Sequence, residues 1–251
     1  MSVRIENNIL NIFNPSNGKE VGNIPITSIN ELNEILSKSK NKAIEYNFST
    51  ISYRSRLVDR FRKKIVSRLE DFVQIICQET GKKYEEGITE IFTSVEYMKR
   101  ASILSKTVLT PERRRTGILK IKRATVWYEP YGVAGIISPW NYPLILTLSP
   151  ITEALLAGNT IVLKPSEQTP LTAKLVKEVW DSINDNDILQ NVYGTGEIGN
   201  QLVTANETDI ICFTGSTKIG KKISETCASL FKPVILELGG KDPMIILDDA
   251  N

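Results

Sequence analysis

The amino-terminal stretch begins with an extended, turn-rich segment and continues into apolar residues at helical spacing. Residues up to about Pro25 predict a short hairpin, whose turn is the Asn-Pro-Ser-Asn-Gly run at residues 14–18. Ser28 and Glu31 then stand three positions apart, which is the spacing of a capping box that opens a helix. A helix is therefore expected after Ser28, with an apolar face made of Ile29, Leu32, Ile35 and Leu36.

Two further helices are predicted before residue 110. The first runs from near Ser52 to Thr80, and Gly81 supplies its carboxyl-terminal stop. Its apolar stripe consists of Leu57, Val58, Phe61, Ile65, Leu69, Phe72 and Ile76. The Lys and Arg residues between these positions indicate a solvated face. The second helix covers roughly residues 84–105.

The pattern becomes extended from Gly117 to Glu129. The run LKIKRATVWYE alternates between apolar and polar residues and is rich in β-branched and aromatic side chains. It predicts a protruding strand or hairpin. An exposed edge of this kind needs a partner strand to cover it.

After Tyr131 short apolar strands alternate with helical segments. The strands are expected at residues 133–138, 160–164, 191–193, 210–214 and 234–237. One intervening helix opens at Thr169 and Pro170, with the threonine as N-cap and the proline in the first turn. This rhythm predicts an α/β fold with a doubly wound parallel sheet, whose ligand site lies at the carboxyl ends of the strands.

Composition and charge narrow the function classes. With 41% hydrophobic and 24% charged residues and a net charge of +2, the chain has the make-up of a soluble protein, with no electrostatic case for nucleic acid or a membrane as partner. The amino terminus lacks the apolar core of a secretory signal, and polar residues interrupt the most apolar stretch, residues 142–158. We therefore expect a cytoplasmic protein.

The absence of histidine excludes histidine metal sites and Ser-His or Cys-His nucleophile pairs. Proton transfer must then fall to a carboxylate, lysine, tyrosine, cysteine or water. Cys77, Cys212 and Cys227 have neither zinc nor redox spacing, so we interpret each as a buried, apolar free cysteine. No metal site is predicted.

Four short motifs follow predicted strands. In chain order they are Pro139-Trp140-Asn141, Lys164-Pro165-Ser166-Glu167, Phe213-Thr214-Gly215-Ser216 and Glu237-Leu238-Gly239-Gly240. Turns at one end of a parallel sheet form the ligand site of an α/β protein. The four motifs together therefore predict a single cleft.

Two glycine-rich segments compete as the phosphate-binding loop. Residues 194–199 match the GxGxxG dinucleotide pattern, but the next strand ends without the carboxylate that would hold a ribose. Residues 215–222 match the Walker A pattern except that Lys222 stands where a Mg²⁺-ligating hydroxyl belongs, and Asp248 resembles a Walker B acid. A P-loop nucleotidase is thus one alternative. The other is a metal-free pyrophosphate site at the amino end of the helix that follows Ser216.

Four polar side chains carry the candidate chemistry. Lys164 and Glu167 can bind vicinal ribose hydroxyls, and the carboxylate would repel a 2′-phosphate, which favours NAD over NADP. The alternative for this pair is an exposed ion pair without function. Asn141 can donate to an oxyanion or cap the next helix. Glu237 is expected to be a half-buried general base of raised pKa, or else a strand-end carboxylate with local hydrogen bonds.

In this order, the motifs resemble the aldehyde dehydrogenase superfamily. The likeness extends over NPSNGKEVGNIPI, YEPYGVAGIISPWNYP, AGNTIVLKPSEQTP, FTGSTKIGKKI and KPVILELGGKDPMIIL. The sequences of these segments look most like the branch that oxidises succinate semialdehyde and related aliphatic aldehydes. In this family a cysteine thiolate attacks the aldehyde, hydride passes to NAD(P)⁺, and water releases the acid from the thioester.

The resemblance implies a Rossmann-like cofactor lobe (residues 131–251), an oligomerisation arm (115–130) and a preceding region of hairpin and helices (1–110). It implies NAD as cofactor, with NADP as the alternative. By position, the cofactor would contact Ile137, Ser138, Pro139, Trp140, Asn141, Lys164, Ser166, Glu167, Gly196, Gly199, Phe213, Thr214, Gly215, Ser216, Ile219, Gly220 and Leu238. Asn141 would serve the oxyanion hole, and Glu237 would be the base for thioester hydrolysis.

The chain departs from the family in one respect. The family nucleophile lies in a Gly-Gln-x-Cys stretch beyond the Glu-Leu-Gly-Gly motif, and none of the three cysteines matches it. We therefore expect a chain without the catalytic lobe, inactive alone, which would meet an aldehyde substrate only with that lobe and would form homo-oligomers as part of a full-length enzyme. The alternative is a non-catalytic NAD-binding or interaction module.

Overall fold

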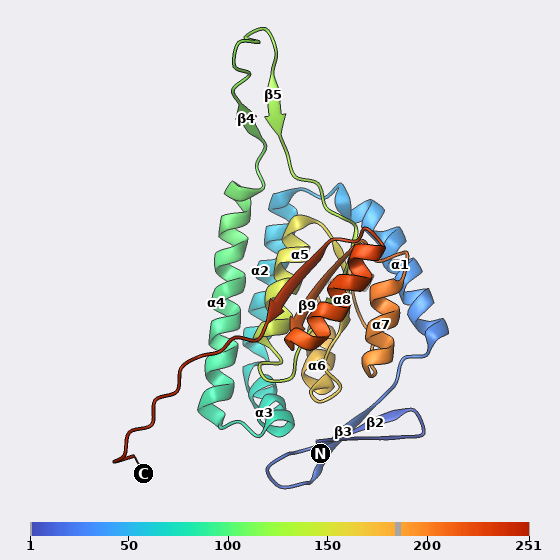
Figure 1. The fold of residues 1–251 in the computed structure, drawn as a ribbon, viewed down its shortest axis with the longest axis vertical. Coiled ribbons are helices and arrows are strands. Elements are labelled where there is room, and N and C mark those ends of the chain that lie inside the picture. The colour runs from blue at the N-terminus through green and yellow to red at the C-terminus, as the bar shows by residue number, and fades with distance from the viewer. Residues whose placement is uncertain (1, 184–186, 251) are drawn as a thin grey trace.

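A five-stranded parallel sheet forms the centre of the molecule (Figure 1). The computed structural model describes residues 2–183 and 187–250. The strands run in the order β10-β9-β6-β7-β8. Their bounds are β6 Val133–Ile137, β7 Thr160–Lys164, β8 Leu189–Asn191, β9 Ile210–Gly215 and β10 Val234–Leu238. The predicted α/β fold with a parallel sheet is confirmed.

Helices cover both faces of this sheet. On one face α5 (Ile145–Ala157) and α6 (Pro170–Asp181) pack in the main hydrophobic cluster. On the other face α7 (Gly196–Thr204) and α8 (Thr217–Ser229) pack in two smaller clusters. The sheet is therefore doubly wound, as predicted.

One strand was predicted out of place. The expected strand at 191–193 is wrong by two residues, because β8 pairs with β7 from Leu189, opposite Ile161, to Asn191, opposite Leu163. Val192 is also buried, so the apolar pattern alone fits either position.

Four helices precede the sheet: α1 Ile29–Asn47, α2 Ile51–Ser67, α3 Leu69–Thr80 and α4 Tyr84–Val108. Ser28 caps α1 by accepting from Glu31 N, as predicted. The single helix predicted from Ser52 to Thr80 is wrong. Arg68, with φ −114° and ψ 23°, divides it into α2 and α3, while the apolar stripe continues across the break. Gly81 ends α3 in the left-handed region, with φ 75°.

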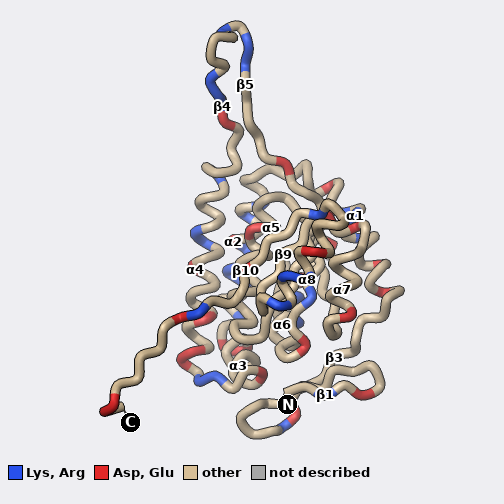
Figure 2. The backbone as a smooth tube through the Cα atoms, in the orientation of Figure 1, with Lys and Arg blue, Asp and Glu red and all other residues tan. Residues whose placement is uncertain are grey.

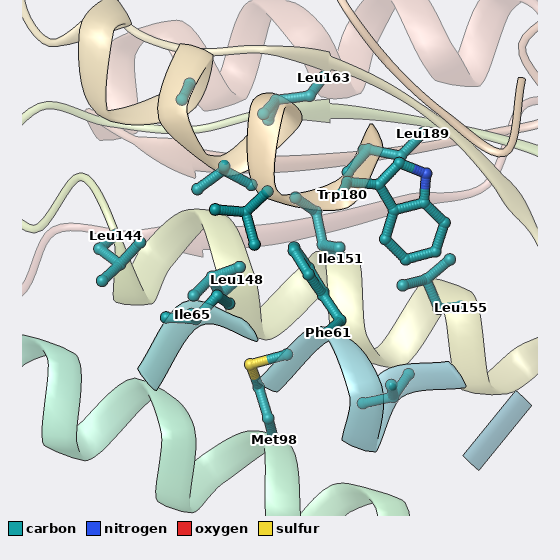
Figure 3. Close-up of a cluster of buried hydrophobic side chains, with 14 of the residues drawn as sticks. Phe61, Ile65, Met98, Leu144, Leu148, Ile151, Leu155, Leu163, Trp180 and Leu189 are labelled. Atoms are coloured by element: carbon teal, nitrogen blue, oxygen red, sulfur yellow. The ribbon is translucent and has the colours of Figure 1, made fainter. Parts of the chain in front are cut away.

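The main core lies between these helices and the sheet. Figure 3 shows Phe61 of α2 beside Trp180 of α6, with ring centroids 5.2 Å apart in an edge-on arrangement. Both side chains are fully buried. This contact joins the amino-terminal helices to a helix of the α/β layer.

Two antiparallel units lie outside the parallel sheet. The first consists of β1 Val3–Glu6, β2 Ile9–Phe13 and β3 Glu20–Pro25, so the predicted hairpin gains a third strand. The second is a hairpin that projects from the body, made of β4 Glu112–Arg114 and β5 Ala124–Val126 (Figure 1). The extended pattern at 117–129 is thus strand only at 124–126, and its partner lies upstream. In the described part of the chain, no helix is both long and apolar enough to cross a membrane.

Candidate functional site

A cavity of about 480 Å³ lies where the strand order reverses, between β6 and β9. In the sheet Ile137 pairs with Lys164 of β7 and with Phe213 of β9, so three motif residues stand in one row. Ligands of open α/β sheets bind at such a reversal, outside the carboxyl ends of the strands. The cavity therefore occupies the position that the sequence predicts for the cleft.

Most of the predicted cofactor residues line this cavity. They are Ile137, Ser138, Pro139, Trp140, Lys164, Ser166, Glu167, Gly196, Gly199, Phe213, Thr214, Gly215, Ser216 and Ile219. Three do not. Asn141 and Leu238 line a neighbouring cavity of about 700 Å³. Gly220 is buried in α8, where an added Cβ would lie 2.5 Å from Leu238 Cδ2, so its absence of a side chain lets α8 approach β10.

Six residues that were not predicted as cofactor contacts also line the first cavity: Gln168, Asn200, Val203, Lys222, Ile223 and Thr226. Helical spacing could have identified several of them. Val203 lies four positions after Gly199, and Ile223 lies four positions after Ile219, so each pair shares one helix face. Lys222 places a second cationic side chain on the cavity lining, in addition to Lys164.

Lys164 is buried, with 4% of its surface exposed. Its Nζ donates to Pro165 O at 3.1 Å and lies 3.4 Å from a carboxylate oxygen of Glu167. Burial lowers the pKa of this ammonium, and the Glu167 charge partly restores it. The alternative of a solvent-exposed pair is therefore wrong for Lys164, whereas the Glu167 side chain keeps 39% of its surface exposed. A buried ammonium with an incomplete set of partners is suited to donate to a ligand oxygen.

Two helix amino termini border the cavity. Thr195 caps α7 by accepting from Glu197 N at 3.4 Å, and Ser216 caps α8 by accepting from Ile219 N at 3.4 Å. The remaining N–H groups of a first helical turn have no partner within the helix, and the helix dipole places positive potential there. The Gly215–Ser216 turn therefore has the geometry that suits an anion without a metal.

The second cavity holds both predicted catalytic residues and a thiol. Asn141, Glu237 and Cys212 line it, and Trp140 borders both cavities. Glu237 is exposed, because β10 is an edge strand of the sheet, so the expected half burial is wrong.

The cysteines differ in burial. Cys227 is fully buried, while Cys77 and Cys212 are partly buried. Burial, reinforced by the charges of Glu153 and Glu237, raises the pKa of Cys212 to about 11. Burial also raises the pKa of Cys77 and that of Cys227. All three are therefore protonated thiols at neutral pH and poor nucleophiles.

Thr169 is the N-cap residue of α6 and Pro170 stands in its first turn, as predicted, but the Thr169 side chain makes no capping hydrogen bond. The Glu79 carboxylate of α3 accepts from the first-turn amides of α6 instead, namely Leu171 N at 2.6 Å and Thr172 N at 2.8 Å. The helix is therefore capped from outside its own segment.

Comparison with known proteins gives the family. The sequence matches the aldehyde dehydrogenase family over residues 3–251. It is 32% identical over 263 residues to chloroplastic betaine aldehyde dehydrogenase of Beta vulgaris, covering 98% of this chain and 51% of that protein. It is 32% identical over 252 residues to mitochondrial succinate-semialdehyde dehydrogenase of Arabidopsis thaliana, covering 98% and 47%.

The solved structures agree. The crystal structure of NADP-dependent glyceraldehyde-3-phosphate dehydrogenase from Bacillus halodurans, complexed with NADP, has a TM-score of 0.89 and 33% identity, over 98% of this chain and 52% of that chain. The chain spans about half the length of the curated relatives it matches. The family match, the shared fold and the ordered motifs agree, and the chain belongs to the aldehyde dehydrogenase family.

Proposed function

We propose that this chain forms the NAD-binding part of an enzyme that oxidises an aldehyde to a carboxylic acid. One observation carries the proposal: Ile137, Lys164 and Phe213 stand in one row beside two helix amino termini, and all of them border one cavity. Of the relatives, one is named for betaine aldehyde and another for succinate semialdehyde. These names do not single out one aldehyde. Because the sequence segments look most like the branch that oxidises succinate semialdehyde, a semialdehyde is our first substrate to test.

The residues of the cavity fit a dinucleotide in chemistry and arrangement. The first-turn N–H groups of α8 are suited to a pyrophosphate, and Lys164 and Glu167 to the hydroxyls of a ribose. Apolar side chains from β6, α7 and α8 supply a wall for an adenine ring: Ile137, Val203, Ile219 and Ile223. When bound, NAD supplies the acceptor for the hydride that leaves the aldehyde carbon.

The second cavity contains side chains suited to the chemical steps that act on the aldehyde. The Asn141 amide can donate to an oxyanion, and the Glu237 carboxylate can take a proton from water. Both face a space of about 700 Å³ that meets the first cavity at Trp140. Because the three thiols are protonated, we propose that none of them attacks the aldehyde, and that residues 1–251 alone do not turn it over.

Direct titration tests the proposal. We expect calorimetry of the 251-residue chain to detect NAD binding, together with quenching of the half-exposed Trp140, a signal that Trp140→Phe removes. Well-folded protein that shows no NAD signal would refute the proposal. Mg²⁺-dependent ATP hydrolysis would favour the P-loop alternative instead. NAD binding that never supports aldehyde oxidation, even with a catalytic half supplied in trans, would favour the non-catalytic module.

Glu167 is predicted to set the preference for NAD over NADP. Glu167→Gln removes the charge that repels a 2′-phosphate, so we expect NADP affinity to rise about 10-fold while NAD affinity falls slightly. The measurement is the ratio of the two dissociation constants. Glu197→Gln is the control, because it removes an exposed carboxylate in the first turn of α7 that does not line the cavity. An unchanged ratio in Glu167→Gln would contradict this role.

We also propose that the arm at residues 115–130 mediates self-association. Ile118 and Ile121 at its tip are each 96% exposed, an arrangement that favours a covering surface. Basic residues surround them (Figure 2): Arg113, Arg114, Arg115, Lys120, Lys122 and Arg123. We expect light scattering to give a mass above the 28.1 kDa monomer, and Ile118→Ser with Ile121→Ser to shift it towards the monomer. Ile44→Ser, at an exposed site on α1, should leave the mass unchanged.

A further inference from the structure

The helices that follow the two main site loops are held by carboxylates from outside the sheet. Neither α5 nor α6 has a side-chain cap of its own. Glu90 of α4 accepts from Leu144 N at 2.8 Å and from Ile145 N at 3.3 Å, at the start of α5. Glu79 of α3 does the same for α6, and it also accepts from Thr172 Oγ1 at 2.6 Å. By contrast, α7 and α8 are capped by their own Thr195 and Ser216.

Each capped helix follows a loop that lines the first cavity. The loop between β6 and α5 carries Ser138, Pro139 and Trp140, and the loop between β7 and α6 carries Ser166 and Glu167. Each loop is fixed at one end by a strand of the sheet and at the other by a carboxylate of the amino-terminal helices. A carboxylate that accepts from amides at a helix amino terminus makes charge-assisted bonds, which are short and directional. The position of each loop therefore depends on α3 or α4.

We propose that Glu79 and Glu90 are positioning residues for the cofactor cleft, which hold the two loops in the geometry that binds NAD. The inference rests on the proposed function. Both residues are almost completely buried, with 2% and 3% of their surfaces exposed, and neither lines the cavity, so they would act without touching the ligand. They act through Leu144, Ile145, Leu171 and Thr172.

The two carboxylates differ in their counter-charge. Glu90 forms an ion pair with Lys82 at 2.8 Å. For Glu79, no cation among the described residues lies within ion-pair distance, and burial raises its pKa to about 7 against three hydrogen bonds that lower it. The Glu79 charge also acts on Tyr193, which follows β8. Its own pKa is raised to about 12, chiefly by burial, with Glu178 and Asp181 of α6 contributing. Tyr193 therefore does not titrate near neutrality.

Ionisation of Glu79 has two opposite consequences. The folded chain keeps a proton between the ordinary carboxyl pKa of 4.5 and about 7 that the unfolded chain has lost, so global stability falls as pH rises through this window. The ionised carboxylate nevertheless accepts more strongly from Leu171 N and Thr172 N, so the loop before α6 is held more firmly. Because the chain contains no histidine, few other groups titrate there.

The test compares Glu79→Gln and Glu90→Gln with matched controls. For each variant we expect about 10-fold weaker NAD binding, the equivalent of one hydrogen bond to a charged group. We also expect faster hydrogen exchange confined to residues 165–172 in the first variant and 138–146 in the second. Glu178→Gln on α6 and Glu96→Gln on α4 remove exposed carboxylates and should change neither.

Each result has a defined meaning. Exchange that stays unchanged in both loops, or that rises equally in every helix, would overturn the positioning role and leave a purely structural one. Hydrogen exchange needs no ligand, so wild-type protein that fails to bind NAD would refute the proposed function without deciding this inference.

The pH dependence of the wild-type chain gives a second test. From roughly pH 5.5 to pH 8.5, NAD affinity should rise with a midpoint near 7, whereas the melting temperature should fall up to about pH 7 and then level off. Glu79→Gln should remove both trends. Affinity and melting temperature that change in the same direction would overturn the role assigned to Glu79.

Discussion

Gly196→Trp is expected to weaken NAD binding strongly while leaving the fold intact. Gly196 is the first residue of α7 and lines the cavity, yet a Cβ added there meets no protein atom within 4 Å. The indole of Gly196→Trp therefore has room in the free protein and extends into the space that a dinucleotide would occupy. We expect the dissociation constant for NAD to increase at least about 100-fold, a loss of roughly 2.7 kcal/mol.

Two variants separate blockage from damage to the helix. Glu197→Trp places the same bulk in the same turn of α7, at an exposed position outside the cavity, and should bind NAD normally. Gly196→Ala should give a small effect. Calorimetry measures the affinities, and thermal melting shows whether each variant folds. Wild-type affinity in folded Gly196→Trp would mean that the ligand does not lie in this cavity.

The site loops were predictable because their chemistry is local to the strand ends. Apolar runs that end at Ile137, Lys164 and Phe213 identify parallel strands, and parallel strands end at one edge of a sheet. Their register could not be derived from those runs, yet the structure places all three residues in one row. The Ser216 cap of α8 was predictable for the same reason, since its partner lies three residues away.

The features that sequence reasoning missed depend on distant partners. The hydrogen bond from Leu171 N to Glu79 joins residues 92 positions apart, so the local Thr169–Pro170 pattern identified the right helix start and the wrong capping group. The exposure of Glu237 depends on whether another strand covers β10, which its own residues do not specify. The break at Arg68 leaves the apolar stripe continuous, and periodicity therefore cannot detect it.

Truncation of Phe61 is expected to cause the largest loss of stability among these variants. The side chain is fully buried and meets Trp180 edge-on at 5.2 Å, so Phe61→Ala removes both apolar burial and an aromatic contact between α2 and α6. Replacement of a buried phenylalanine by alanine costs about 3–5 kcal/mol, because the cavity that remains is only partly filled by relaxation. Urea unfolding should therefore show a free energy of unfolding lowered by that amount, seen as a lower midpoint concentration with little change in slope.

A second substitution on the same helix controls for helix propensity. Val66 is 44% exposed, and Val66→Ala should change the free energy of unfolding by no more than about 0.5 kcal/mol. A loss below about 1 kcal/mol in Phe61→Ala would mean that α2 does not pack on α6 in solution. Because Glu79 reaches α6 from α3 in the same helical layer, loosening this contact should also weaken NAD binding in the folded protein. Stability lost without any loss of NAD affinity would contradict that link between the helical layer and the cleft.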